Sequence, residues 1–233
     1  MNPHFSIIVP TLNEEKYLPR LLESLSMQLF RDFEVIIVDG GSSDKTIEIA
    51  LMYADKVVVE RCNQSKARNI GANISNGKYL VFLDADAAVD PLFLKRARDI
   101  FAQYEHANVR CIVGRPEPIV LTKIGRAAFA FGWLLCRLKA TFPGYMGILV
   151  ERSIFKRAGG FNPNLAYGED LDFLIRVSSL TKIVYPKDLV VYSDTRRWMK
   201  NGKINIVEVS RIVGMVVEYL TTRKSHTSYP VIR

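Results

Sequence analysis

The sequence predicts an α/β fold in which a mostly parallel sheet is covered by helices on both faces. Short apolar runs of strand length alternate with segments whose apolar residues recur at helical spacing, and short polar connections join them. Such alternation favours parallel strands buried on both faces. Ligands of sheets of this kind bind beyond the carboxyl ends of the strands, so the residues that follow each strand are the first candidates for a site.

The first half of the chain carries the clearest alternation. Its predicted strands are Phe5–Val9, Phe33–Val38, Lys56–Val59 and Tyr79–Leu83. Helices are predicted around Leu18 to Leu25, around Ile47 to Leu51, and from about Lys66 to Asn73. Each strand is followed by a polar or glycine-rich turn, which is typical of strand-to-helix connections.

After about Ala107 the alternation weakens, and the prediction is coarser. Predicted strands are Val109–Val113, Tyr145–Val150, Ile183–Tyr185 and Val190–Tyr192, with a helix marked by Leu171, Leu174, Ile175 and Ser178. A final helix is predicted from an apolar stripe made by Ile206, Val209, Ile212, Val213, Val216, Val217 and Leu220. Charged residues within that helix exclude a membrane span. We expect one domain over residues 1–233.

Composition is that of a globular protein, with 48% hydrophobic and 24% charged residues. Cys62, Cys111 and Cys136 lie far apart, which favours neither a disulfide framework nor a zinc site and fits a reducing cytoplasm. Neither a signal peptide nor a spanning helix is predicted. The net charge of +8 favours polyanionic partners, which could be nucleic acid, anionic lipid or phosphorylated small molecules.

The segment from Lys123 to Arg157 is strongly basic, and Glu151 is its only acidic residue. It contains an aromatic apolar stretch with Phe131 and Trp133 between basic flanks. This pattern suits peripheral contact with a membrane surface. It suits equally a core helix whose charged ends are solvated.

Two aspartates end the most strand-like stretch of the first half. Asp84 and Asp86 directly follow Tyr79–Leu83, and a spacing of two along an extended chain would place both carboxylates on one side. A divalent cation would relieve their repulsion and could hold a diphosphate. A polar turn at a strand end is the alternative interpretation.

Asp39 stands at the end of a second strand and could accept hydrogen bonds from a nucleoside. The following Gly40 to Asp44 stretch is no dinucleotide fingerprint, and Ser43 or Asp44 could cap the next helix. After the first strand, Thr11 and Glu14 match a capping box, which would explain that stretch without a ligand.

Taken together, these segments resemble the inverting family 2 glycosyltransferases of the Rossmann-like GT-A fold, over roughly Phe5 to Trp198. The ordered set comprises Ile8–Glu15, Val35–Asp44, Lys66–Gly71, Asp84–Asp86, Gly159–Phe161 and Gly168–Asp170. Each motif alone is common, whereas the whole set in this order is specific. The resemblance implies a nucleotide-binding half at about 1–107 and an acceptor-binding half at about 108–224.

The resemblance also implies roles for individual residues. A nucleotide-sugar donor would be bound by Pro10, Thr11, Asn13, Glu14, Asp39, Lys66, Arg68 and Asp84. Asp86, with Asp84, would hold Mg²⁺ or Mn²⁺ at the diphosphate. Asp170 would be the general base, with Glu169 beside it, although both acids could instead favour a helix N-terminus.

Late in the chain, Arg196-Arg197-Trp198 resembles part of an element of processive family members. Asp194 stands where their glutamine would be, and predicted spans are absent, so we expect addition of a single sugar. Arg197 could clamp the diphosphate and Trp198 could line the acceptor channel, or the segment is a solvated basic loop. Asp194 and His226 are weak candidates for a third metal contact.

The expected acceptor is a saccharide or a lipid-linked molecule, and the expected location is cytoplasmic with peripheral docking on the inner face of the membrane. A sugar-phosphate nucleotidyltransferase is disfavoured because the first strand ends in Pro10 to Glu14 and not in a basic glycine-rich loop. A nucleic-acid-binding module is disfavoured by acids at the strand ends and by the lack of an aromatic stacking motif. The intact acidic set also argues against a non-catalytic relative.

Overall fold

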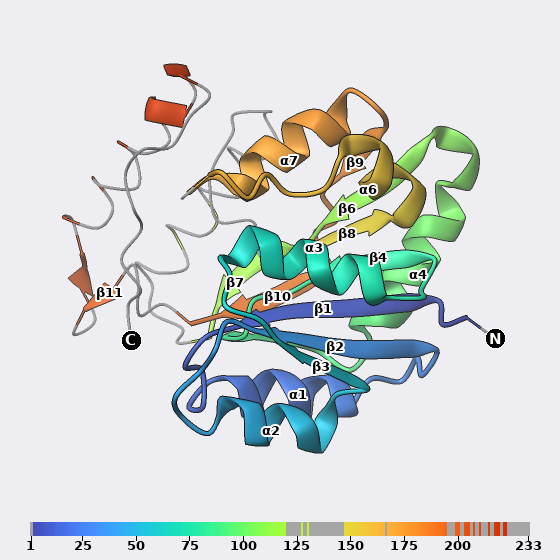
Figure 1. Ribbon diagram of the computed structural model, residues 1–233. Helices are drawn as coiled ribbons and strands as arrows, with labels where there is room; N and C mark the ends of the chain where they lie inside the picture. The colour runs from blue at the N-terminus through green and yellow to red at the C-terminus, as the bar shows by residue number, and fades with distance from the viewer. Residues whose placement is uncertain are drawn as a thin grey trace.

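A seven-stranded sheet of order β3-β2-β1-β4-β8-β6-β9 forms the centre of the computed structural model (Figure 1). The structure describes residues 2–119, 147–165 and 167–194, together with isolated positions at 127, 130 and between 199 and 222. Its strands are β1 (Phe5–Thr11), β2 (Phe33–Asp39), β3 (Lys56–Val59), β4 (Tyr79–Phe82), β6 (Val109–Val113), β8 (Ile148–Glu151) and β9 (Lys182–Val184). Strand β8 is antiparallel to β4 and β6, and the other pairings are parallel. The predicted mostly parallel sheet is confirmed.

Helices cover both faces of this sheet, as predicted. One face carries α1 (Leu18–Ser26), α2 (Thr46–Tyr53) and α4 (Phe93–Gln103), and the other carries α3 (Gln64–Ile74), α6 (Arg152–Ala158) and α7 (Glu169–Ser178). Figure 1 shows α1 and α2 below the sheet and α3, α6 and α7 above it. A short 3₁₀ turn, η1 (Glu105–Ala107), links α4 to β6.

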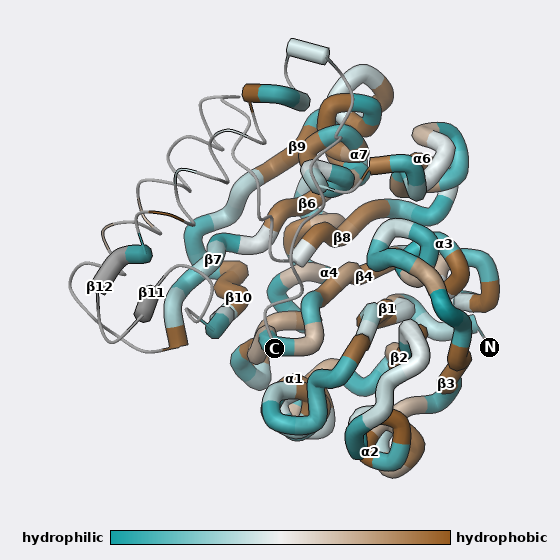
Figure 2. The backbone as a smooth tube through the Cα atoms, turned by 60° about the vertical axis from the view of Figure 1, so that its left-hand side comes forward, coloured by the Kyte–Doolittle hydropathy of each residue, from teal (hydrophilic) through white to brown (hydrophobic). Residues whose placement is uncertain are grey.

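The core explains why the strand sequences are apolar without interruption. Along β1, the side chains of Phe5, Ile7 and Val9 pack on the α1 and α4 face, whereas Ile8 packs on the α3 and α6 face. All four are fully buried. Burial of each such side chain stabilises the fold by about 1.5–3 kcal/mol. Figure 2 shows the hydrophobic residues running along inner strands such as β8.

Several elements were not predicted. They are α4, α6, β5 (Ala87–Val89) and β7 (Arg115–Pro118); the two strands join the predicted β10 (Val190–Ser193) in a second sheet of order β5-β10-β7. Helix α4 could have been found, because Phe93, Leu94, Ala97 and Phe101 recur at helical spacing and are buried. Strands β5 and β7 are too short to give a periodic pattern. Two-residue strands β11 (Met199–Lys200) and β12 (Lys203–Ile204) form a small hairpin.

The predicted final helix is described only in part. Its described positions lie between 207 and 222, and they contact the core through Tyr219, which is 2% exposed and packs on Leu165 and Leu171. Tyr219 also donates a hydrogen bond to Asp172 at 2.8 Å. Val217 is the only residue of the predicted apolar stripe that is described, and it is 54% exposed. The described part of this helix is therefore anchored by an aromatic residue. Among the described residues, no helix is long and apolar enough to cross a membrane.

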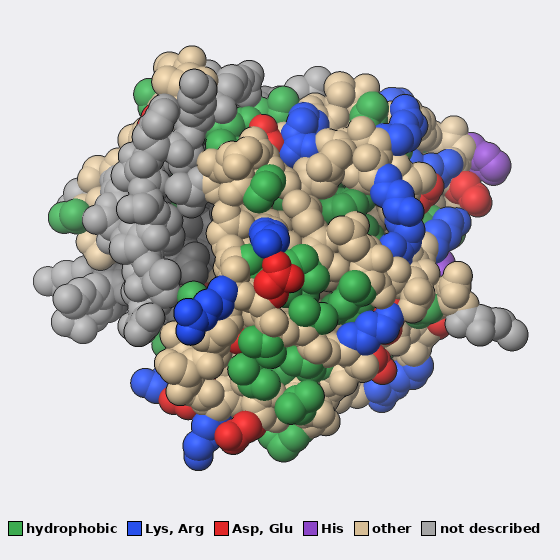
Figure 3. All heavy atoms as spheres, in the orientation of Figure 1, with side chains coloured by type: hydrophobic (Ala, Val, Ile, Leu, Met, Phe, Trp, Pro, Cys, Tyr) green, Lys and Arg blue, Asp and Glu red, His purple; other side chains and the backbone are tan. Residues whose placement is uncertain are grey.

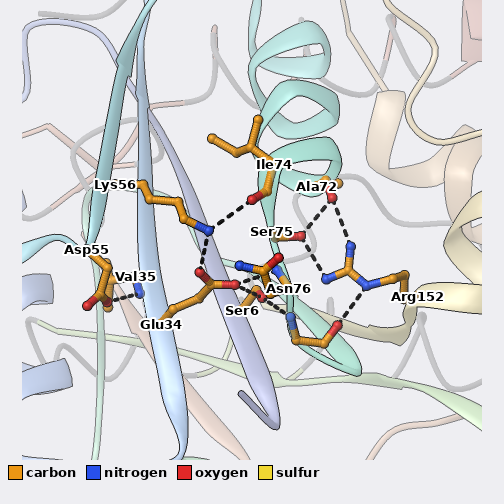
Figure 4. A network of polar contacts seen from close by, with 11 residues as sticks. Ser6, Glu34, Val35, Asp55, Lys56, Ala72, Ile74, Ser75, Asn76 and Arg152 are labelled. Carbon is orange, nitrogen blue, oxygen red and sulfur yellow. Dashed lines mark hydrogen bonds and ion pairs between the residues drawn. The ribbon is translucent and has the colours of Figure 1, made fainter. Parts of the chain in front are cut away.

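A polar network ties the amino ends of the strands together (Figure 4). Glu34 at the start of β2 is buried, and its carboxylate accepts hydrogen bonds from Ser6, from Lys56 and from the Asn76 backbone. Gly77 lies so close to β1 that an added Cβ would stand 2.6 Å from the Ser6 nitrogen. Strands β1, β2 and β3 and the turn before β4 are thereby fixed to one another.

Arg152 extends this network to α6. Its guanidinium donates to the carbonyl oxygens of Gly77 and Ala72 and to the Ser75 hydroxyl. A cation at the carboxyl end of α3 also interacts favourably with the helix dipole. The carboxyl end of α3 is therefore held, which leaves its amino end pointing to the opposite edge of the sheet.

Candidate active site

Asp39 organises the first part of the site, at the carboxyl ends of β1 and β2. Its side chain is fully buried, and its two oxygens accept hydrogen bonds from the Thr11 hydroxyl, the Ser42 hydroxyl, and the backbone N–H groups of Gly41 and Ser42. Gly41 has a φ of 94°, a conformation that suits glycine. The Asp39 carboxylate therefore shapes the loop that follows β2.

The loop that follows β1 is hydrogen-bonded to the loop that follows β2. Asn13 adopts a left-handed conformation with φ of 54°, donates its backbone N–H to the Ser42 hydroxyl and accepts from the Ser43 backbone with its side-chain oxygen. The Glu14 backbone N–H donates to the Thr46 hydroxyl at 2.7 Å. The predicted nucleotide residues of the first two strand ends thus lie together, with Pro10 opposite Val38 in the β1–β2 register.

The capping interpretations of these loops fare differently. Helix α1 begins at Leu18 after Tyr17, with no side-chain cap, and the Thr11 hydroxyl donates to Asp39. The capping box of Thr11 and Glu14 is therefore wrong, because Thr11 still belongs to β1. Asp44, in contrast, accepts the backbone N–H of Thr46 at 3.0 Å, which satisfies the first amide of α2 as predicted.

Arg68 on α3 joins two acidic segments in the second part of the site. Its side chain is 6% exposed, and its guanidinium donates to Asp84 and to Glu169 at 2.8 Å each. Gln64, one turn earlier on α3, also donates to Asp84 at 2.9 Å. Three separate elements therefore converge on one cation.

The charge balance around Arg68 favours its ionised form. Burial alone would lower the pKa of the guanidinium, but the carboxylates of Asp84, Glu169 and Asp170 outweigh it and raise the pKa. The guanidinium also lies 5.1 Å from the centre of the Phe161 ring, a cation–π distance. Its buried Nε–H has no hydrogen-bond acceptor among the described residues.

Asn69 fastens the loop that leads to the acidic residues of α7. Its side-chain amide donates to the Phe161 carbonyl at 2.7 Å, and its oxygen accepts the Phe161 N–H at 2.9 Å. Gly160, with φ of 69°, leaves room for this contact, since a Cβ there would stand 2.7 Å from the Asn69 oxygen. Asn63 caps α3 and donates to the Pro163 carbonyl. Asn63 and Asn69 of α3 thus hold the loop formed by residues 159–165 in place.

Asp84 and Asp86 lie in a turn, which corrects the extended geometry expected from the sequence. The Ala87 N–H donates to the Asp84 carbonyl at 3.0 Å and closes the turn before β5. Ala85 is buried while both aspartates are partly exposed, so the two carboxylates still share the solvent side. Strand β5 pairs Ala87 with Ser193 of β10, so Asp86 and Asp194 are the chain neighbours of this pair.

Glu169 and Asp170 begin α7, after Gly168 in a left-handed conformation. The interpretation as acids at a helix N-terminus therefore holds for their position. Asp170 is 7% exposed and accepts the Leu171 N–H at 2.7 Å, whereas Glu169 is turned to Arg68. Both predicted catalytic acids lie within the Arg68 cluster, on the far side from Asp39.

Not every predicted residue joins the site. Lys66 lies on α3, but its ammonium forms an exposed ion pair with Glu60 at 2.7 Å. Arg197, Trp198 and His226 lie outside the described residues, as does the basic aromatic segment, residues 123–139, except positions 127 and 130. No three His, Cys, Asp or Glu side chains gather into a metal-binding group in the part of the chain that the structure describes.

Comparison with known proteins identifies the family. The model of glycosyl transferase family 2 matches residues 6–157, which covers both strand-end loops and the Arg68 cluster as far as Asp86. The chain belongs to glycosyltransferase family 2.

Relatives in this family are also glycosyltransferases by name. The PGL/p-HBAD biosynthesis glycosyltransferase Rv2957 of Mycobacterium tuberculosis is 30% identical over 199 residues, which cover 78% of this chain and 72% of the relative. An uncharacterised glycosyltransferase of Haemophilus influenzae is 32% identical over 181 residues, 74% of this chain and 61% of that protein. The family 2 protein described here is accordingly a glycosyltransferase.

Solved structures confirm the GT-A fold. Mannosyltransferase PcManGT from Pyrobaculum calidifontis, in complex with GDP-Man and Mn²⁺, matches with a TM-score of 0.72 at 20% identity, over 99% of this chain and 67% of that one. Staphylococcus aureus TarS 1-349 in complex with UDP-GlcNAc matches with a TM-score of 0.69 at 20% identity, over 98% of this chain and 68% of that one. At this identity the likeness concerns the fold.

Sequence reasoning missed the supporting residues of this family 2 site. Ser42, Gln64 and Asn69 make the contacts that hold Asp39, Asp84 and the Phe161 loop. Ser42 and Asn69 stand inside motifs that the sequence analysis quotes, so their place in those motifs was the available signal. Gln64 precedes its motif, and nothing in the sequence distinguishes it.

Proposed function

We propose that this glycosyltransferase transfers a single sugar from a nucleotide-diphosphate sugar to an acceptor hydroxyl or lipid phosphate, with inversion at the anomeric carbon. The observation that carries the proposal is the convergence of Asp84, Glu169 and Asp170 on the buried Arg68. It joins the end of β4, where a donor would lie, to the start of α7, where an acceptor would be activated. The halves 1–107 and 108–224 would then serve donor and acceptor.

The donor nucleotide would lie across the ends of β1, β2 and β4. Hydrogen bonds fix the two loops that follow β1 and β2 to each other there, and these loops carry Thr11, Asn13, Glu14 and Asp39. Arg68 supplies a fixed positive charge that holds the Asp84 carboxylate at the end of β4. The GDP-Man and UDP-GlcNAc complexes of the structural neighbours support a nucleotide-sugar donor.

The donor set also fits a divalent cation. Asp84 already accepts from Arg68 and Gln64, so Asp86 would be the main metal ligand, and Asp194 follows Ser193, the strand partner of Ala87. Mg²⁺ usually binds through one or two carboxylates plus substrate phosphates, so a three-carboxylate group is not required. Mg²⁺ or Mn²⁺ held there would supply positive charge to the leaving diphosphate.

Asp170 is the better candidate for the general base. The resemblance to family 2 assigns this role to Asp170, whose carboxylate accepts the Leu171 N–H at the start of α7, and it places Glu169, which forms an ion pair with Arg68, beside it. In an inverting displacement, the acceptor oxygen bonds to the anomeric carbon as the bond to the diphosphate breaks. A carboxylate takes the acceptor proton in the same step, and no covalent enzyme intermediate forms.

A donor screen tests this proposal. Release of nucleoside diphosphate would be followed across a panel of nucleotide sugars, with and without Mn²⁺ and a polyprenyl phosphate. We expect Asp86→Ala to abolish both transfer and metal-dependent nucleotide binding, while Asp99→Ala, an exposed aspartate on α4, leaves both unchanged. Full activity of Asp86→Ala, or indifference of the unmodified protein to excess chelator, would overturn the metal assignment.

The acceptor side of the proposal favours a lipid-linked molecule and peripheral membrane docking. It rests on the basic aromatic segment, in which each Lys or Arg near an anionic leaflet contributes on the order of 1 kcal/mol. Co-sedimentation with anionic vesicles is expected, and it should weaken at high salt and in Phe131→Ala/Trp133→Ala. Efficient transfer to a water-soluble sugar without vesicle binding would instead assign a saccharide acceptor.

A further inference from the structure

Strand β3 forms one edge of the main sheet, and β2 is its only strand neighbour among the described residues. Edge strands that are protected from pairing usually carry a charge, a proline or a bulge at their centre. Strand β3 carries one charge, at its first residue Lys56, and Val57, Val58 and Val59 carry none of these features. The strand therefore offers an apolar edge with backbone groups suited to a further strand.

Exposed apolar side chains flank this edge. Leu51 and Met52 at the end of α2 are 66% and 70% exposed, Val59 is 54% exposed, and Ile74 at the end of α3 is 37% exposed. Figure 3 shows hydrophobic side chains gathered over α2 and β3 on the face in view. Helix α2 carries Glu48 as its only charged residue, and a helix that is apolar on both faces is usually buried on both.

The charge order along this edge selects the partner. The sequence from 55 to 61 reads Asp-Lys-Val-Val-Val-Glu-Arg. Antiparallel pairing of two copies about Val58 places Lys56 opposite Glu60 of the second copy and Asp55 opposite Arg61. Parallel pairing in register would instead place like charges together. Opposite charges across a strand pair stabilise it, and like charges destabilise it.

We propose that a second copy of this chain binds this edge, with the two β3 strands antiparallel about a two-fold axis through Val58. The side chains of Lys56 and Glu60 are 34% and 44% exposed, so both can reach across the interface while they keep their own partners Glu34 and Lys66. The exposed residues of α2 and Ile74 would pack beside the paired strands. A membrane surface would cover the apolar residues but would leave the strand's backbone groups without partners.

Solution mass tests the dimer. Sedimentation equilibrium over a range of protein concentrations should give twice the 26.4 kDa of one chain. Met52→Lys/Val59→Lys should return the mass to that of one chain, since both residues are exposed and the charges would face an apolar partner. Met27→Lys/Leu29→Lys is the matched control, because these residues are 61% and 66% exposed but lie away from β3, and it should stay dimeric.

A cross-link tests the register. Residues opposite each other in an antiparallel pair have Cα atoms about 4.5–5.5 Å apart, within the ~4.4–6.8 Å range of disulfides. Val58→Cys should therefore give a disulfide-linked dimer on mild oxidation, identified by mass spectrometry as a 58-to-58 link, and Leu29→Cys should not. A single-chain mass at all concentrations overturns the proposal. So does a dimer that survives Met52→Lys/Val59→Lys, or one that gives no 58-to-58 link.

Discussion

Arg68 and Arg152 lie at opposite ends of the strands of the main sheet, and their guanidinium groups bind different kinds of partner. Arg68, at the carboxyl ends of the strands, is bound by the carboxylates of Asp84 and Glu169. Arg152, at the amino ends, donates to two carbonyl oxygens and to the Ser75 hydroxyl. Carbonyl partners cannot leave without unfolding the segment that bears them, whereas carboxylates on side chains can exchange one cation for another.

The pKa values of the two arginines are shifted in opposite directions. Burial lowers the pKa of Arg152, and Glu34 opposes this only in part. Around Arg68 the carboxylates outweigh burial, so its pKa is raised. An excess of acid around a buried cation is suited to a ligand that brings its own cation or displaces one acid. We therefore expect substitutions around Arg68 to alter the rate of transfer, and substitutions around Arg152 to alter the free energy of unfolding.

The largest expected effect is that of Asp170→Asn. The substitution keeps an oxygen for the Leu171 N–H but removes the proton acceptor, so the transfer rate should fall by roughly 10²- to 10⁴-fold with donor affinity nearly intact. Turnover and donor binding, by calorimetry, are measured on the same protein. Asp172→Asn, in the same helical turn, should keep the rate. Parallel loss of donor binding in Asp170→Asn would make Asp170 a structural residue and Glu169 the better base.

Asn69→Ala should come next. Without the two hydrogen bonds to Phe161, the loop before α7 is no longer fixed to α3, and a shift of about 1 Å at the acids can cost on the order of 10²-fold in rate. Donor affinity should change little, because the loops around Asp39 are unchanged. Asn73→Ala, exposed on the same helix, is the control. An unchanged rate in Asn69→Ala would show that the Phe161 loop does not position the acids.

Arg152→Met should show the opposite split. Loss of its hydrogen bonds leaves acceptors in a buried turn unsatisfied, which should lower the free energy of unfolding by about 1–3 kcal/mol. Urea unfolding measures this, and the rate of transfer should stay that of the unmodified protein. Arg157→Met, exposed on the same helix, should change neither quantity. A reduced rate in folded Arg152→Met would break the contrast between the two edges.

Glu34→Gln should have the smallest effect, present at neutral pH and disappearing in acid. Burial alone would raise the pKa of Glu34, but hydrogen bonds from Lys56, Asn76 and Ser6 lower it below its usual 4.5. A lowered carboxyl pKa contributes stability that is present above the unfolded-state pKa and is lost as the pH falls through the folded-state pKa. The unmodified protein should therefore lose more stability below pH 4.5 than Glu34→Gln does. Glu23→Gln, which is exposed, should retain the full acid loss in the same unfolding titration.

Sequence could predict the parts of the site that lie at strand ends. Asp39 and Asp84 follow apolar runs that are readable without a structure, and parallel strands bring such ends together. Contacts between distant segments gave no such signal. Asn69 and Phe161 are 92 residues apart, and β8 enters the sheet between β4 and β6 although it follows both in the chain. Local patterns do not encode these long-range pairings.

Two errors have local physical causes. Thr11 and Glu14 match a capping box by spacing, but β1 continues through Pro10 to Thr11, and the helix starts later, at Leu18. The spacing of Asp84 and Asp86 predicts an extended backbone after β4, yet the Ala87 N–H donates to the Asp84 carbonyl and closes a turn. In both places the sequence pattern is short, so backbone hydrogen bonds to neighbouring segments decide the conformation.

Backbone hydrogen bonds hold Ile119 and Gly147, the residues on either side of the segment 120–146. The Ile119 N–H donates to the Ser193 carbonyl, and the Gly147 carbonyl accepts the Gly114 N–H at 2.9 Å. When both ends of a connection are held by the sheets, doubling its length costs only about 0.6 kcal/mol in closure entropy. Insertions, deletions and new sequences can therefore accumulate between these points while the strands that lead to Asp39 and Asp84 stay unchanged.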